Sequence, residues 1–311
     1  MKATVVGAGN VGATTAEYIL QEGLADVYLV DVVDGLAAGK ALDMAEAAPI
    51  LGHSCSITGG TDYGPAEGSD IVVVTAGVAR KPGMSRDDLL KINGNIMADV
   101  ATNIWQAAPD AIVIVVSNPL DVTTHIFHET SGFPTQRVMG MAGVLDTARF
   151  RTFIAMEAGC SPEDVSAMVL GGHGDSMVPL ASQASVSGVP VTQLLDDDTI
   201  ARLVQRTRDG GAEIVGLLKT GSAYYAPAAA VTQMVSSILR NENRILPACA
   251  YVTGQYGIRN IFIGVPVKLG ARGVEEIIEI DLTADELTAL RGSGAHVEEA
   301  IQGWNAMKGS E

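Results

Sequence analysis

The sequence predicts an α/β fold, a doubly wound parallel sheet followed by a second, α+β domain. Through the first half of the chain, short apolar runs alternate with helix-like segments, which is typical of a parallel sheet with right-handed crossovers. After about Gly143, helix-like segments mix with shorter strands instead. We therefore expect two domains, residues 1–142 and 143–311.

In the first domain, β-branched and apolar runs predict strands, and alanine-rich or amphipathic segments predict helices. The runs at 71–75 and 112–116 are apolar except for Thr75 at the end of the first, as expected of strands covered on both faces. Pro49 is expected to end the second helix. In chain order we expect a strand at 3–6, a helix at 10–22, a strand at 27–30, a helix at 36–48, a strand at 71–75, a helix at 89–107 and a strand at 112–116.

The second domain is predicted to end in a long helix. Thr283 is its expected N-cap, and Glu286 three residues later completes a capping box. The other elements expected there are helices at 147–158, 200–218 and 228–239 and strands at 165–170, 261–267 and 275–281.

Composition excludes several classes of protein. With 47% hydrophobic and 18% charged residues, the chain is globular rather than disordered. Its apolar runs are strand-sized, far below the ~20 residues of a membrane helix. The N-terminus enters a strand at once, without a signal-peptide pattern, and the three cysteines form no CxxC pair. We therefore expect a cytoplasmic protein in a reducing compartment, with no membrane partner.

The charge balance is acidic: 20 basic residues oppose 36 acidic ones, for a net charge of −16. Such a field does not attract nucleic acid or anionic membranes. An acidic, lysine-poor surface fits a protein adapted to high salt, and it fits an acidic mesophilic enzyme equally well.

A glycine-rich turn directly follows the first predicted strand and opens the first predicted helix. Its residues are Gly7, Ala8, Gly9, Asn10, Val11 and Gly12. In a Rossmann βαβ unit, this spacing allows a tight turn and a close approach to a pyrophosphate at the helix N-terminus. Asp31 ends the next strand, 19 residues past Gly12, where an acid binds ribose hydroxyls and repels a 2′-phosphate. The sequence therefore predicts NAD, rather than NADP, as cofactor.

Three cations gather after the strand at 71–75, at Arg80, Lys81 and Arg86. In an open parallel sheet, ligands bind beyond the carboxyl ends of strands. Arginine suits a carboxylate because its planar fork bonds both oxygens. This loop either binds a small anionic substrate or balances nearby acids such as Asp87 and Asp88.

His173 lies among glycines, in Gly171-Gly172-His173-Gly174-Asp175, after a predicted strand. Histidine titrates near neutral pH and can exchange a proton with a substrate hydroxyl. Its acidic partner is open at this level, because Asp175 is adjacent and Asp146 is distant in sequence. No metal site is predicted.

Together these motifs resemble the lactate/malate dehydrogenase family, and within it the malate dehydrogenases of the lactate-dehydrogenase-like type. The resemblance covers essentially the whole chain. Besides the glycine turn and Asp31, it is carried by Thr75-Ala76-Gly77, Arg80-Lys81-Pro82-Gly83-Met84-Ser85-Arg86, Ser117-Asn118-Pro119, Leu145-Asp146-Thr147-Ala148-Arg149-Phe150-Arg151 and Gly172-His173-Gly174-Asp175.

The resemblance implies NAD-dependent interconversion of malate and oxaloacetate, with His173 as the proton acceptor. It implies that Asp146, not Asp175, holds the histidine ring. Arg149 would bind the carboxylate beside the reacting carbon, and Arg86 would polarise the carbonyl. Arg80 would bind the distal carboxylate, at a position where lactate dehydrogenases carry glutamine.

The resemblance also implies that Asn118 bonds the substrate oxygen and that Asn93, Val116, Ser117 and Asn118 line the nicotinamide. It suggests a homotetramer, with a dimer as the alternative. Three rival functions remain open from the residues: a lactate or other 2-hydroxyacid dehydrogenase, a non-catalytic NAD-binding redox sensor, and a methyltransferase on a similar sheet. Arg80 argues against the first, and the set of His173, Asp146 and Arg149 argues against the second.

Overall fold

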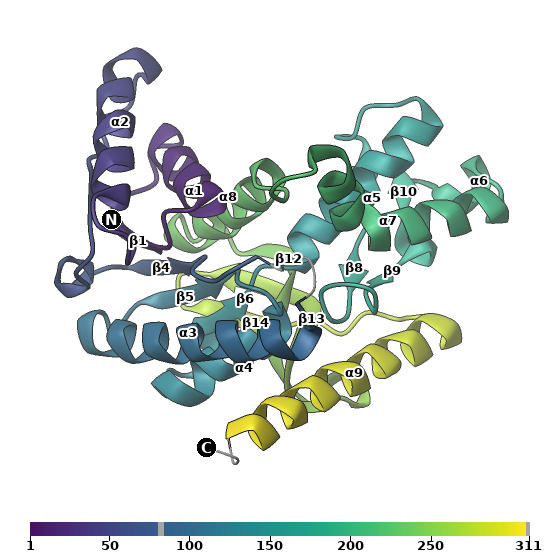
Figure 1. Ribbon diagram of the computed structural model, residues 1–311. Coiled ribbons are helices and arrows are strands. Elements are labelled where there is room, and N and C mark those ends of the chain that lie inside the picture. The colour runs from purple at the N-terminus through teal and green to yellow at the C-terminus, as the bar shows by residue number, and fades with distance from the viewer. Residues whose placement is uncertain (80–83, 309–311) are drawn as a thin grey trace.

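The computed structural model describes residues 1–79 and 84–308. Within these residues, nine strands form one large sheet in the order β14-β13-β12-β6-β5-β4-β1-β2-β3 (Figure 1). The strands from β3 to β6 pair in parallel, in the order β3-β2-β1-β4-β5-β6. This is the order of a doubly wound α/β sheet, so the predicted fold class is confirmed.

The strands of the large sheet are longest in its antiparallel part. Their bounds are β1 Lys2–Val6, β2 Asp26–Val30, β3 Ile57–Gly60, β4 Ile71–Val74, β5 Ile112–Val115, β6 Val138–Gly140, β12 Arg244–Thr253, β13 Arg259–Gly270 and β14 Gly273–Ile277. Two smaller sheets contain β7 Val165–Ser166, β8 Val169–Leu170, β9 Val178–Pro179, β10 Ser185–Val186 and β11 Val189–Pro190.

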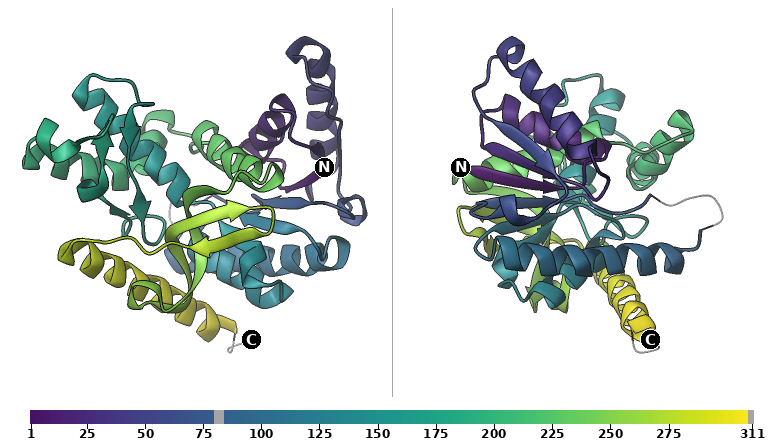
Figure 2. Two further views of the ribbon diagram at one scale, coloured as in Figure 1. Left: turned by 180° about the vertical axis from the view of Figure 1, so that it is seen from behind. Right: turned by 60° about the vertical axis from the view of Figure 1, so that its left-hand side comes forward.

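Helices cover both faces of the large sheet. The helices of the described residues are α1 Asn10–Gln21, α2 Leu36–Leu51, α3 Arg86–Ala107, α4 Leu120–Ser131, α5 Gly143–Ala158, α6 Val191–Leu194, α7 Asp197–Leu218, α8 Tyr225–Leu239 and α9 Ala284–Lys308. Figure 1 shows α1 and α8 on one side of the sheet and α3 and α4 on the other. Figure 2 shows α6 and α7 at the opposite end of the molecule from α2. In the part of the chain described here, no helix combines the length and apolarity needed to cross a bilayer.

The central strands are buried, as their composition predicts. Every residue of β4 and β5 is buried, because helices cover both faces of the sheet there. The apolar core follows the large sheet and includes side chains of β12 and β13. A second apolar cluster, which includes Phe150 and Leu203, packs between α5 and α7.

The second half of the chain contributes three antiparallel strands to the sheet of the first half. β12 pairs with β6 through Cys249 and Gly140, and β13 and β14 follow it. The sequence pattern did not predict β12. Proline normally argues against a central strand, but Pro247 pairs directly with Pro266 of β13, so neither faces an unmatched donor at that position.

Several sequence-based boundaries differ from the structure by a few residues, and two of the differences change an element. Pro49 does not end α2, which continues to Leu51 with the proline inside it. A proline in the last turn removes only one hydrogen bond, and Gly52, in the left-handed conformation, then ends the helix. The strand expected at 165–170 is two strands, because β7 pairs with β10 whereas β8 pairs with β9.

The predicted capping box of α9 is confirmed. The Glu286 backbone N–H donates to Thr283 Oγ1 at 3.2 Å, and the Thr283 N–H donates to Glu286 Oε2 at 3.0 Å. Two of the donors that a helix N-terminus leaves unpaired are thus satisfied.

Candidate active site

The conformation of the turn between β1 and α1 requires glycine at two positions. Gly7 adopts φ +101°, and a Cβ there would lie 2.8 Å from both Ala76 N and Thr75 Oγ1. A Cβ at Gly12 would collide with the Gly7 carbonyl, whereas one at Gly9 would point into open space. Among the described residues, α1 has no side-chain cap and no acid in its first turn. This backbone, with Asn10 and Val11 opening the helix, therefore fits the phosphates of a dinucleotide.

Asp31 follows β2 and lies against this turn. Its Oδ2 accepts the Ala8 N–H at 2.7 Å, and its Oδ1 accepts the Val33 N–H at 2.9 Å. From α2, Lys40 Nζ donates to the Ala8 carbonyl at 2.8 Å. Charged side chains therefore hold both the N–H and the carbonyl of Ala8. Sequence reasoning missed Lys40, because nothing local links it to a turn 32 residues earlier.

Asn93 holds the backbone at the ends of β4 and β5. Its amide accepts the Val78 N–H at 2.8 Å and donates to the Asn118 carbonyl at 2.6 Å. Ser117 Oγ donates to the Ala76 carbonyl at 2.5 Å. Asn93 and Ser117 are buried, Val116 is half-buried, and the Asn118 side chain is exposed. Asn93 thus fixes the segment that carries Asn118.

His173, Asp146 and Arg149 form one cluster. Asp146 and Arg149 lie one turn apart near the start of α5, and the structure brings His173 to them from the loop after β8. Asp146 Oδ2 is 2.8 Å from His173 Nδ1, and Arg149 Nη1 donates to Asp146 Oδ1 at 3.1 Å. Asp146 is 1% exposed. The residue that meets the histidine ring is therefore Asp146.

The charge of Asp146 determines how His173 titrates. Burial, the largest single influence, favours the neutral imidazole, but the charge and hydrogen bond of the Asp146 carboxylate, together with other nearby charge, outweigh it, so the pKa of His173 is raised. The carboxylate of Asp121 adds to this effect, and Arg149 opposes it. The His173 side chain stays 18% exposed, with Nε2 as the ring nitrogen not bound to Asp146.

Arg149 retains binding capacity. Its Nε is buried and meets no hydrogen-bond acceptor in the described part of the chain. A buried donor without a partner is costly, and a carboxylate ligand would satisfy it. Arg80 lies outside the described residues, and Arg86 is described only as the first residue of α3.

A cavity of about 830 Å³ brings Asn118 and His173 together. Leu90, Val122 and Val297 give it apolar wall. Its remaining lining residues are Asp87, Leu89, Pro119, Asp121, Gly172, Gly174, Asp175, Ser176, His296, Glu299, Ala300 and Gly303.

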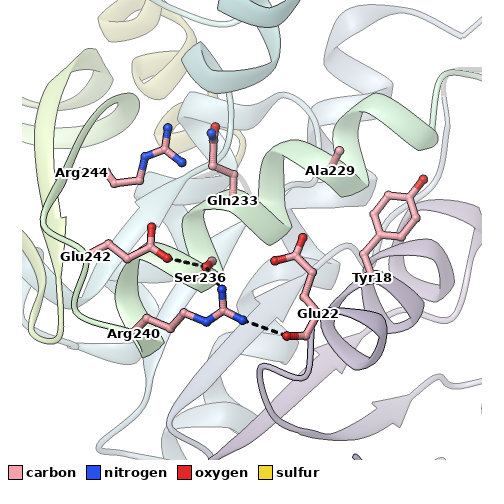
Figure 3. A pocket seen from close by; sticks show the side chains of 8 residues that line it. All are labelled: Tyr18, Glu22, Ala229, Gln233, Ser236, Arg240, Glu242 and Arg244. Carbon is pink, nitrogen blue, oxygen red and sulfur yellow. Dashed lines mark hydrogen bonds between the residues drawn. The ribbon is translucent and has the colours of Figure 1, made fainter. Parts of the chain in front are cut away.

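A second cavity, of about 560 Å³, lies between α1 and α8 and is lined by none of the predicted site residues (Figure 3). Arg240 donates to the Glu22 carbonyl at 2.8 Å, and Ser236 donates to Glu242 at 2.7 Å. The first contact links the end of α1 to the end of α8, and the second is local to the end of α8. Within residues 1–79 and 84–308, no group of three or more His, Cys, Asp or Glu side chains could hold a metal ion.

A glycine turn followed by an acid, together with a histidine–aspartate pair beside a half-buried arginine, defines an NAD-dependent dehydrogenase. The profile described as lactate/malate dehydrogenase, NAD binding domain, matches residues 1–140, and that of the alpha/beta C-terminal domain matches residues 143–307. The chain therefore belongs to the lactate/malate dehydrogenase family.

Individual relatives cover nearly the whole chain. A malate dehydrogenase of Thermomicrobium roseum is 56% identical over 97% of this chain and 97% of its own. The structure of malate dehydrogenase from Salinibacter ruber has a TM-score of 0.96 at 51% identity, covering 100% of this chain and 99% of that chain. A Cryptosporidium parvum lactate dehydrogenase, solved with lactic acid and nicotinamide adenine dinucleotide, has a TM-score of 0.94 at 40% identity, covering 97% of this chain and 96% of that chain. The fold alone therefore does not separate the two substrates.

Proposed function

We propose that this protein interconverts (S)-malate and oxaloacetate, with NAD as the hydride carrier. The observation that carries the proposal is the cluster of His173, Asp146 and Arg149, because binding NAD alone needs no proton acceptor. The malate dehydrogenases reported above, at 56% and 51% identity, support malate rather than lactate. Arg80, where lactate dehydrogenases carry glutamine, supports it further.

The arginines would hold the dicarboxylate. Arg149 is proposed to bind the carboxylate beside the reacting carbon, because its buried Nε has no acceptor among the described residues. We propose that Arg80 binds the distal carboxylate and that Arg86 polarises the reacting carbonyl. Asn118, exposed in the cavity beside His173, would bond the substrate oxygen.

The proton step falls to His173. Asp146 holds Nδ1, which leaves Nε2 to accept the proton of the malate hydroxyl. When bound, NAD would accept the hydride from C2. Asp31 would hold its ribose, the glycine turn its phosphates, and Asn93 with residues 116–118 would line its nicotinamide. Asp146 then stabilises the imidazolium, and the reverse reaction returns the proton from Nε2.

A steady-state assay tests the proposal. NADH oxidation is followed by absorbance with oxaloacetate, pyruvate and 2-oxoglutarate. We expect oxaloacetate to be reduced fastest. Faster reduction of pyruvate would support the lactate alternative, and NADH binding without turnover would support the redox sensor.

Cofactor choice should depend on Asp31. Its carboxylate would repel the 2′-phosphate of NADPH, and like charges near a protein surface interact by several kcal/mol at ~4 Å. We expect NADH to be preferred at least about tenfold in kcat/KM, and Asp31→Ser to narrow that preference. Equal use of both cofactors by the native enzyme would contradict the assignment.

Several broader features belong to the same proposal. We propose a domain boundary between residues 142 and 143, where α5 begins.

Exposed apolar side chains on α2 and α7, among them Leu42, Ile50 and Leu217, support a homotetramer or a dimer, which analytical ultracentrifugation would distinguish. The cysteines are free thiols, in keeping with a cytoplasmic protein.

Salt should stabilise the protein if its surface is adapted to salt. Repulsion within a net charge of −16 destabilises the compact state, and ions screen it over ~10 Å at 0.1 M. We expect the midpoint of thermal unfolding to rise from low to molar salt, measured by calorimetry. A flat or falling midpoint would favour the mesophilic alternative.

A further inference from the structure

A second carboxylate lies beneath the histidine loop. Asp121, in the first turn of α4, is 6% exposed. Its Oδ2 accepts the His173 backbone N–H at 2.8 Å, and its Oδ1 accepts the Cys249 thiol at 3.3 Å. One side chain therefore links α4, the histidine loop and β12. None of the roles assigned above uses it.

The partners of Asp121 favour its ionised form. A backbone amide can only donate, and burial and the neighbouring carboxylate raise the pKa of Cys249 well above its usual value, so the thiol keeps its proton and donates too. Burial raises the pKa of Asp121 above its ordinary value, and the His173 N–H, the His173 charge and the Cys249 thiol offset only part of that rise. Protonation would leave Asp121 with a hydroxyl for which neither partner is an acceptor.

The contact with His173 is one of three that anchor its loop. The N–H groups of three successive residues donate to three different elements: Gly171 to Gly264 of β13 at 2.8 Å, Gly172 to Ser293 of α9 at 2.8 Å, and His173 to Asp121. Asp121 is the partner that fixes the backbone of the histidine itself. It also makes the contact that brings a negative charge.

We propose that Asp121 is a positioning residue for His173, whose carboxylate both fixes the histidine backbone and stabilises the imidazolium alongside Asp146. The inference rests on the function proposed above, in which His173 carries the proton. Asp146 acts on the ring through Nδ1, whereas Asp121 acts through the main chain and through its charge. Among the side chains that the structure describes, Arg149 on α5 also acts on the His173 charge, and Cys249 on β12 contacts Asp121. Asp175 on the same loop, Asp87 on α3, and His296 and Glu299 on α9 line the cavity that His173 faces.

The sign of the pH effect follows from the charge. Removing a negative charge near the imidazolium lowers the pKa of His173. Oxaloacetate reduction needs the protonated histidine, so its alkaline limb should move to lower pH. Malate oxidation needs the neutral histidine, so its acidic limb should also move to lower pH. A merely structural defect would lower both rates without shifting either limb.

The variant Asp121→Asn removes the charge and keeps the shape and one acceptor for the His173 N–H. We expect the loss in kcat/KM for oxaloacetate to be at least about threefold greater at pH 9 than at pH 7. For malate oxidation, the loss in kcat/KM of Asp121→Asn relative to the native protein should become smaller as the pH falls. The matched control is Glu129→Gln, eight residues further along α4 and about 12 Å away, where the carboxylate pairs with His125 at 3.2 Å. It should shift neither limb.

NMR titration of the His173 ring, assigned with His173→Asn, gives a readout that does not depend on turnover. A lower pKa in Asp121→Asn than in the native protein supports the inference even if oxaloacetate proves not to be the substrate. Asp121→Ser, which is also uncharged, takes its place if the asparagine variant does not fold. Equal titration in native and variant proteins, or a uniform loss of rate with unmoved limbs, would overturn the inference.

Discussion

Replacing His173 with asparagine is expected to lower kcat about 10²–10⁴-fold in both directions, the usual contribution of a general acid–base. Asparagine can still bond Asp146, which lies 2.8 Å from His173 Nδ1, but it cannot carry the proton. NADH binding, measured by fluorescence titration, should stay nearly unchanged, because the glycine turn and Asp31 are untouched. Near-native turnover would remove His173 from its assigned role.

A pair of aspartate variants serves as the internal comparison. Asp146→Asn should impair turnover more than Asp175→Asn, because the Asp146 carboxylate contacts both His173 and Arg149. The opposite order would mean that the adjacent carboxylate supports the histidine.

The second large effect concerns substrate choice at Arg80. Oxaloacetate and pyruvate share the reacting carbonyl and its neighbouring carboxylate, so Arg149 and Arg86 cannot distinguish them. Only the distal group differs, and with pyruvate a desolvated guanidinium would face a methyl group. An unpaired charge in a closed site costs several kcal/mol, so we expect the native enzyme to prefer oxaloacetate at least ~10³-fold in kcat/KM.

Arg80→Gln should collapse that preference, lowering kcat/KM for oxaloacetate sharply and raising it for pyruvate. The matched control is Arg137→Gln, which alters an arginine that pairs with Asp110 at 3.8 Å, and it should leave the substrate ratio unchanged. If the ratio in Arg80→Gln barely moves, Arg80 does not bind the distal carboxylate.

Local patterns predicted most of the first domain. The glycine turn and the apolar strands β4 and β5 depend on neighbouring residues, so spacing and composition were sufficient. Two of the differences involve proline, a local signal whose effect depends on its place in the element and on what faces it. Pro247 lies in β12 because Pro266 faces it, and Pro49 lies in the last turn of α2.

The site itself was harder to predict, because its contacts join distant parts of the chain. Asp146 lies 27 residues from His173, and Asp121 lies 52 residues away. Distance along the sequence did not decide whether Asp146 or Asp175 is the acidic partner of His173, and only the family resemblance favoured Asp146. Nothing local indicated Asp121 or Ser293, because a backbone N–H carries no signal of the side chain that will accept it.

The pairing of β12 with β6 has a consequence for how the enzyme can move. Gly264 of β13 forms backbone hydrogen bonds with Gly171, so the loop that carries His173 is attached to the large sheet. The strands that end near Asn118 belong to the same sheet. Swinging the two halves apart would require breaking these hydrogen bonds. These hydrogen bonds thus fix the loop that carries His173 relative to the strand ends near Asn118, and a motion that opens the cavity without breaking them would have to come from segments outside the large sheet.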